Sequence, residues 1–178
     1  ETLMKNTLFK LISVLMLAAL LAAALPFQSA FAAGLGDESQ PPDPRDGSRM
    51  VERKFKLEQR RYEGQGKAFD KSDDLLAKAQ EIITRAGENG LDTGAAQSAL
   101  DDFETAIAEV KPLYGQAGEL IDDHAGFDGS GKVTDVQVAA ETVEKIHKLL
   151  DQVRDDVHDE REALQHALWD LFQEGLKK

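Results

Sequence analysis

The sequence contains no cysteine, and only 6% of its 178 residues are aromatic. Without a thiol, the chain has no disulfide, no thiolate metal site, no Cys nucleophile and no Cys to carry a lipid anchor. Proline is also scarce, with five residues, whereas 30% of the residues are charged. Few aromatic residues and many charged ones are typical of helical proteins rather than sheet proteins. The composition therefore predicts an all-α chain held together by packing alone.

The charge and the motifs exclude several functions. The formal net charge is -12, so the surface repels phosphates and we expect no nucleic-acid partner. The sequence has no GxSxG, HExxH or phosphate-binding glycine loop. Acidic pairs such as Asp155-Asp156 are adjacent and point to different sides of a helix, so they do not converge on a substrate. We expect neither enzymatic activity nor a cofactor.

Residues 4–32 have the pattern of a secretory signal peptide. Lys5 and Lys10 precede an apolar run, Leu11 to Leu25, and Ala30-Phe31-Ala32 closes the segment with a small-x-small pattern. This order predicts cleavage after Ala32 and export to the periplasm, the cell envelope or the medium. An uncleaved anchor is the alternative, although the run is shorter than the ~20 residues that a spanning helix needs. After cleavage we expect no stable membrane insertion.

Residues 33–48 are rich in proline and almost free of apolar side chains, which predicts a disordered leader. Apolar residues then recur at intervals of three and four in three stretches, at about 49–86, 93–124 and 134–174. Such a seam keeps one stripe of each helix facing partner helices. Thr134 and Gln137 form a capping-box pattern at the start of the third stretch.

The two connections between these stretches are short, so neighbouring helices are expected to run antiparallel. The prediction for residues 49–178 is an elongated, antiparallel, up-down-up three-helix bundle with coiled-coil-like packing. Its seam in the last stretch comprises Val136, Ala139, Val143, Ile146, Leu150, Val153, Val157, Leu164, Leu168 and Leu171.

The second connection resembles part of a calcium loop. With Gly131 at the sixth position, Asp128 is third and Ser130 is fifth. The first position is Gly126 and the twelfth is Gln137, where calcium loops carry Asp and a bidentate Glu. Asp128 and Ser130 are therefore candidates for weak calcium binding, and a plain helix-to-helix turn is the alternative.

The last stretch carries candidate ligands for a transition metal. His158, Glu162 and His166 follow one another at intervals of four, so one helical face presents two imidazoles and a carboxylate. Such side chains bind zinc, copper or nickel. The same spacing is also that of ordinary solvated ion pairs on a charged helix. A divalent metal bound weakly at these positions is the predicted alternative to a plain charged face.

The start of the first stretch is basic. The cluster comprises Arg45, Arg49, Arg53, Lys54, Lys56, Arg60 and Arg61. Basic residues at a helix N-terminus oppose the helix dipole, so other groups should compensate them. The compensating negative charge would come either from acidic residues around Asp122, Asp123 and Asp128, or from an anionic component of the cell envelope.

The last stretch is predicted to be longer than the middle one, at about 41 against 31 residues, or ~60 Å against ~46 Å at ~1.5 Å per residue. Its end would then lack an antiparallel partner. Four apolar residues there, Leu168, Trp169, Leu171 and Phe172, are candidates for binding a partner or a second copy. Coverage by Leu91 and the end of the first stretch is the alternative.

The segments NGLDT and HAGFDGSGKVTD, followed by a long helix, resemble those of small exported bacterial helical-bundle proteins. That resemblance implies export and a helical fold, and no activity. The LTxxQ-motif periplasmic chaperones are similar in architecture only. Their LTxxQ motif is absent from this sequence, and its nearest match is Thr134-Asp135-Val136-Gln137. We expect a non-catalytic protein that acts by protein–protein interaction or scaffolding, with a metal-responsive or metal-buffering role as the alternative.

Overall fold

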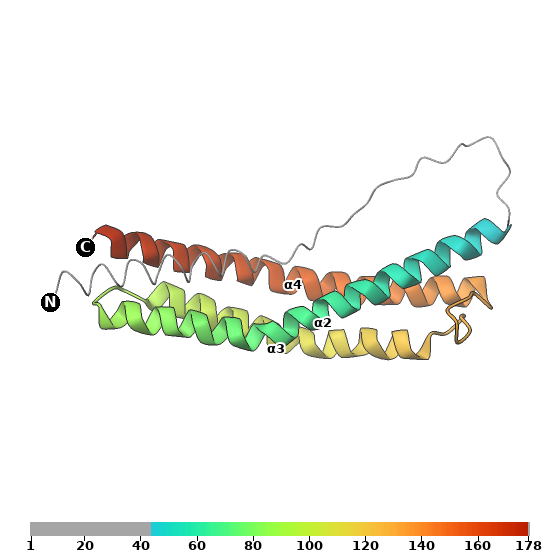
Figure 1. Ribbon diagram of the computed structural model, residues 1–178, viewed down its shortest axis with the longest axis horizontal. Helices are drawn as coiled ribbons and strands as arrows, with labels where there is room; N and C mark the ends of the chain where they lie inside the picture. Colours follow the sequence, from blue (N-terminus) through green and yellow to red (C-terminus); the bar gives the residue numbers. More distant parts are fainter. Residues whose placement is uncertain (1–43, 178) are drawn as a thin grey trace, which may run out of the picture. The chain divides into compact units, whose positions relative to one another are not determined.

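The computed structural model describes residues 44–177, which form three helices joined by two short connections (Figure 1). The helices are α2 (Pro44–Glu88), α3 (Gly94–Asp123) and α4 (Val136–Lys177). In this part of the chain the only strand-like pairing is an isolated antiparallel bridge between Phe127 and Val133. The predicted all-α class and the bundle of three helices are confirmed. The signal peptide predicted at 4–32 and the leader residues 33–43 lie outside the described residues.

Helix α2 begins before the predicted start at Arg49. Its first residue is Pro44, so residues 44–48 belong to the helix and not to a disordered leader. Proline suits this position because its φ angle is already helical, and its missing N–H would have no partner inside the first turn. The helix thus begins five residues before the predicted start.

The residue that caps α4 also differs from the prediction. Asp135, and not Thr134, accepts hydrogen bonds through its Oδ1 from the backbone N–H groups of Gln137 at 3.0 Å and Val138 at 3.1 Å. Gln137 directs its side-chain amide to Glu141 at 2.9 Å, so it does not complete a capping box. An aspartate carboxylate satisfies two free N–H groups and also suits the positive end of the helix dipole.

The described chain forms two compact units, and each helix contributes a segment to both. Unit 1 contains residues 68–109 and 155–177. Its core consists of apolar side chains from all three helices and from the first connection, namely Ala79, Ile83, Ala86, Leu91, Ala96, Leu100, Phe103, Ile107, Leu164, Leu168 and Leu171. Leu164, Leu168 and Leu171 belong to the seam predicted for the last stretch, so the spacing of three and four identified the buried face of α4 in this unit.

Unit 2 contains residues 44–67 and 110–154. Its core comprises Phe55, Ala117, Phe127, Ala139, Val143, Ile146 and Leu150. One predicted seam residue of α4, Val136, is exposed because it lies at the first residue of the helix, beyond the start of the buried stripe.

A pair of stacked tyrosines joins α2 and α3 within unit 2. The rings of Tyr62 and Tyr114 are parallel to within 7°, with centroids 4.2 Å apart. Each tyrosine lies against a glycine of the other helix, Tyr62 against Gly118 and Tyr114 against Gly66. The Tyr114 hydroxyl also donates to the backbone carbonyl of Tyr62 at 3.1 Å. Glycine costs helix stability but here leaves room for an aromatic ring.

Candidate functional site

The connection between α3 and α4 folds around Asp128. Its Oδ1 accepts hydrogen bonds from the backbone N–H of Lys132 at 2.9 Å, the hydroxyl of Ser130 at 2.7 Å and the N–H of Ser130 at 2.8 Å. These hydrogen bonds lower the pKa of Asp128, and the bond from the Lys132 N–H has the largest effect. The two predicted calcium ligands thus contact each other within one turn, where the carboxylate holds the backbone in place.

The same connection is anchored to α2 inside unit 2. The Phe127 ring stacks on Phe55 with centroids 4.2 Å apart. Glu52 accepts hydrogen bonds from Lys132 Nζ at 3.1 Å and from the Val133 N–H at 3.3 Å. The bond from Lys132 is the main reason why the pKa of Glu52 is lowered.

Gly126, in the same connection, packs closely against Ala139 of α4. Its φ is +86°, and a Cβ at this position would lie 2.7 Å from the Ala139 Cα. Both facts require glycine, because a side chain would be strained and would collide with the backbone. The connection is therefore a rigid, packed turn.

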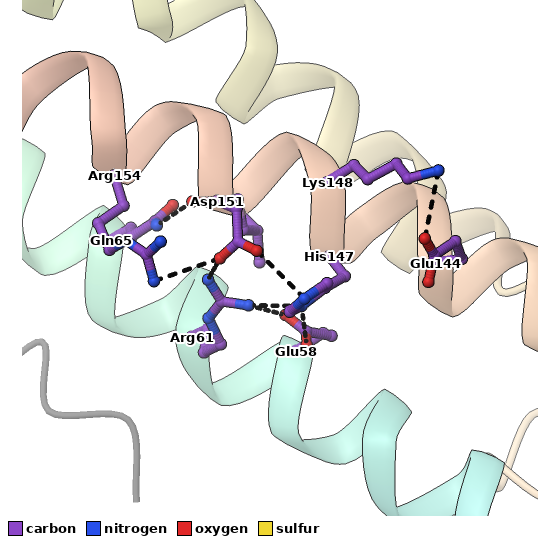
Figure 2. Close-up of polar contacts among 9 residues, drawn as sticks. Glu58, Arg61, Gln65, Glu144, His147, Lys148, Asp151 and Arg154 are labelled. Carbon is purple, nitrogen blue, oxygen red and sulfur yellow. Dashed lines mark hydrogen bonds and ion pairs between the residues drawn. The ribbon is translucent and has the colours of Figure 1, made fainter. Parts of the chain in front are cut away.

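The most extensive polar contacts of the described chain lie between α2 and α4 in unit 2, where Figure 2 shows Glu58, Arg61, His147 and Asp151 pointing toward one another. Arg61 donates to Glu58 Oε2 at 2.8 Å and to Asp151 Oδ1 at 2.5 Å. His147 lies 2.9 Å from Glu58 Oε1 through Nδ1 and 3.1 Å from Asp151 Oδ2 through Nε2. Arg154 approaches the same aspartate at 3.3 Å. We refer to Glu58, Arg61, His147 and Asp151 as the ionic cluster.

Glu58 is the buried member of the ionic cluster, with 5% of its side chain exposed, while the other three are partly exposed. A buried carboxylate is costly unless it is paired and hydrogen-bonded, and here Arg61 and His147 supply both kinds of contact. Further along α2, Gln65 is also buried and donates to the Leu150 carbonyl at 2.8 Å.

The contacts of His147 depend on its protonation. Its Nδ1 lies 2.9 Å from both Arg61 Nη1, which donates, and Glu58 Oε1, which accepts. A neutral ring with Nδ1 unprotonated accepts from Arg61, whereas a protonated ring donates to Glu58 and Asp151 together. Which of these contacts the ring makes therefore depends on its tautomer and on whether it is protonated.

The spacing of residues in the first stretch carries a signal for this cluster. Glu58 and Gln65 continue the three-and-four spacing of Phe55 and Tyr62, so they occupy seam positions of the first helix, where a polar side chain requires a partner on a neighbouring helix. His147 and Asp151 are four residues apart and each follows a buried residue, Ile146 or Leu150. Periodicity places both sets near a buried face, but only the packing of the helices shows which residues meet.

The metal candidates on α4 lie in unit 1. His158 Nε2 is 3.4 Å from Glu162 Oε1, and about half of each side chain is exposed. Within residues 44–177, no three His, Asp or Glu side chains are placed to share a metal ion, and this includes the set with His166. The structure therefore brings two of the three predicted ligands, His158 and Glu162, into contact.

The end of α4 is only partly open. Leu168 and Leu171 are 2% and 5% exposed and belong to the core of unit 1 together with Leu91. Of the two alternatives, coverage by Leu91 and the end of the first stretch is the one observed for these two leucines, since they share one core with Leu91, Ile83 and Ala86. Trp169 remains 44% exposed and contacts the half-buried Phe172, with ring centroids 5.7 Å apart.

Comparison with known proteins identifies no relative of the chain, so the fold and these sites are the basis for assigning a function. No protein-family model, no curated protein and no solved structure matches the chain. Of the three helices described, none is long and apolar enough to cross a membrane. The class that the structure defines is an all-α bundle of three helices.

Proposed function

We propose that the chain is a non-catalytic, exported helical-bundle protein that acts by protein–protein interaction or scaffolding in the cell envelope or outside the cell. The observation that carries this proposal is the exposed apolar row at the end of α4. Trp169 is 44% exposed, Leu176 is 43% exposed, and Phe172 lies between them. We call these three residues the C-terminal row.

The spacing of the C-terminal row is that of a helix anchor. Its members stand at positions i, i+3 and i+7, so at 100° per residue they lie within about 60° of one another around the helix. A row with this spacing is how an amphipathic helix enters an apolar groove of a partner. The buried Leu164, Leu168 and Leu171 hold another flank of the helix in unit 1. The row is thus presented on a helix that is already ordered, which lowers the entropic cost of binding.

Export and topology complete the proposal. Export is supported by the basic start, the apolar run and the small-x-small end of residues 4–32. An elongated, antiparallel, up-down-up arrangement with coiled-coil-like packing is supported by the short connections and by the buried residues of α4, which recur at intervals of three and four. The partner is another protein or a second copy of the chain.

Photo-crosslinking in the host's cell envelope tests this function. A p-benzoylphenylalanine at position 172 is expected to capture one defined species, either the dimer or a partner. The same group in place of the exposed Ala163, on the opposite side of α4 from position 172, is expected to capture none. Purified W169S/F172S protein should lose the association that light scattering detects, with an unchanged far-UV circular dichroism spectrum. Equal crosslinks at both positions, or the same mass and the same captured species for the double variant, would refute the role of the row.

A metal-responsive or metal-buffering role is the second candidate, and the contact between His158 and Glu162 favours it. A ligand that binds only the native state raises the free energy of unfolding by mass action, by ~2.7 kcal/mol at a hundredfold excess over its dissociation constant, and so raises the melting temperature. This role predicts a rise with zinc, copper or calcium that EDTA reverses. Zinc or copper stabilisation should disappear in H158A, and calcium stabilisation in D128N. No rise with any of these metals removes this candidate.

A further inference from the structure

The first turns of α2, in unit 2, carry a concentrated positive charge on a negatively charged protein. Residues 47–67 contain seven Lys or Arg against three Glu, a local charge of +4, whereas the whole chain carries -12. The exposed cations of this segment up to residue 60 are Arg49, Arg53, Lys54, Lys56 and Arg60. With Met50 and Leu57 they form what we call the basic face.

Two of the three acidic residues of the same segment make their closest contacts outside the basic face. Glu52 is held by Lys132 and the Val133 N–H, with a smaller contribution from the nearby charge of Lys56, and Glu58 is buried in the ionic cluster, where it pairs with Arg61. The compensation predicted from acidic residues near the α3–α4 connection is not observed within the described residues. Asp128 is bonded within its own turn, and no ion pair joins the basic face to Asp122 or Asp123.

Two large apolar side chains are exposed among these cations. Met50 is 60% exposed and Leu57 is 47% exposed. They are seven residues apart, or ~10 Å along the helix, and Arg53 lies between them on the same side. Phe55, on the other side of the helix, is buried in the core of unit 2. The exposed side thus alternates apolar and basic side chains along one row. Met50 and Leu57 are not part of the core of unit 2, so the packing of this unit does not explain why they are apolar.

We propose that the basic face binds the surface of a bilayer rich in anionic phospholipid. The guanidinium and ammonium groups would contact headgroup phosphates, while Met50 and Leu57 enter the boundary of the acyl chains. Exposed apolar residues between cations on an amphipathic helix suit this interface, where both kinds of contact are made at once. A nucleic acid offers phosphates but no apolar layer, so it leaves Met50 and Leu57 unused. The negative charge elsewhere opposes binding weakly, because salt screens charges beyond ~8 to 10 Å.

This inference does not depend on the interaction proposed for the C-terminal row, because the two surfaces lie at different positions of the chain. A local probe tests it on the full chain. Since the protein has no cysteine, Leu57→Cys gives a single site for a bimane label, whose emission shifts to the blue in an apolar environment. A label at Val138→Cys, another exposed position, reports events that are not specific to the basic face.

The probes are vesicles of phosphatidylglycerol mixed with phosphatidylcholine, and vesicles of phosphatidylcholine alone. We expect the label at position 57 to shift on the anionic vesicles and not on the neutral ones, and the label at position 138 to shift on neither. Replacing Arg49, Arg53 and Arg60 with Gln should raise the lipid concentration at the midpoint roughly a hundredfold, since each cation near an anionic surface contributes about fivefold.

A matched variant separates position from net charge. Lys71, Lys78 and Lys111 are exposed and lie outside the basic face, so K71Q/K78Q/K111Q removes the same charge and should keep the wild-type midpoint. All proteins carry the same residues 1–43, so the two triple variants differ only in which three cations are replaced. The proposal is overturned by equal shifts on neutral and anionic vesicles, or by equal midpoints for the two triple variants. It is also overturned if soluble polyglutamate shifts the label while anionic vesicles do not, which would identify an acidic protein as the partner.

Discussion

Gly118 provides the sharpest test of the packing in unit 2. An added Cβ at this position would lie 2.5 Å from the Tyr62 hydroxyl oxygen and 3.0 Å from the ring carbon that bears it. The ring cannot move aside freely, because it is stacked on Tyr114. Gly115, three residues earlier on α3, is exposed and has nothing within 4 Å of an added Cβ. The pair separates helix propensity from packing on one helix.

The two substitutions are expected to change stability in opposite directions. G115A should stabilise the protein by up to ~1 kcal/mol, the propensity difference between Gly and Ala in a helix. G118A gains the same propensity but overfills a packed contact, which costs ~1 to 3 kcal/mol. The difference between the variants therefore measures the steric cost directly. It corresponds to roughly 2 to 12 °C in melting temperature for a protein of this size.

Thermal melts followed by circular dichroism measure this difference. The double variant Y62F/G118A should recover part of the loss, because it removes the hydroxyl oxygen that lies closest to the new Cβ. A refutation would be a G118A protein as stable as G115A, since Gly118 would then lack the contact with Tyr62 that its placement implies.

Three further outcomes follow from the structure. Arg61→Ala should cost ~1 to 3 kcal/mol in urea unfolding because it leaves a buried carboxylate short of a partner, whereas Lys148→Ala should cost less than ~0.5 kcal/mol because its ion pair is exposed. The lowered pKa values of Glu52 and Asp128 mean that the folded state binds fewer protons than the unfolded state, so their stabilisation is present above pH ~4 and is lost as the pH falls through the lowered values. E52Q and D128N should therefore be less stable at pH 7 and lose less melting temperature between pH 7 and pH 3, and an unchanged acid slope would contradict this. Leu168→Ala should cost ~2 to 5 kcal/mol because it opens a cavity in the core of unit 1, and a change below ~1 kcal/mol would show that the end of α4 is not packed.

The helices were the most predictable part of the fold. Stretches predicted at 49–86, 93–124 and 134–174 correspond to α2, α3 and α4 within a few residues. Such agreement is expected because apolar spacing, glycine-rich connections and capping residues act locally. Glycine in each connection adopts the left-handed conformation that favours this residue, with φ of +75° at Gly90 and +76° at Gly131.

Contacts between helices were less predictable. The helix lengths suggested an uncovered end for α4, but length alone does not show that Leu91 and the end of α2 cover Leu168 and Leu171. Likewise, helix propensity marks Gly66 and Gly118 only as weak positions. Their role depends on a tyrosine of another helix. A sequence gives the face of each helix but not the register in which faces meet.

The polar residues at buried seam positions have a physical role in setting that register. Apolar side chains pack against one another with similar energies in more than one register, so a seam of Ala, Leu and Val specifies alignment weakly. Glu58 and Gln65 are buried, and their hydrogen bonds to His147 and to the Leu150 carbonyl require one particular alignment of α2 and α4 within unit 2. A shift by one turn would bury both without partners, at a cost of several kcal/mol. The ionic cluster therefore contributes more to the uniqueness of the packing than to its strength, as a single polar residue does in a coiled coil.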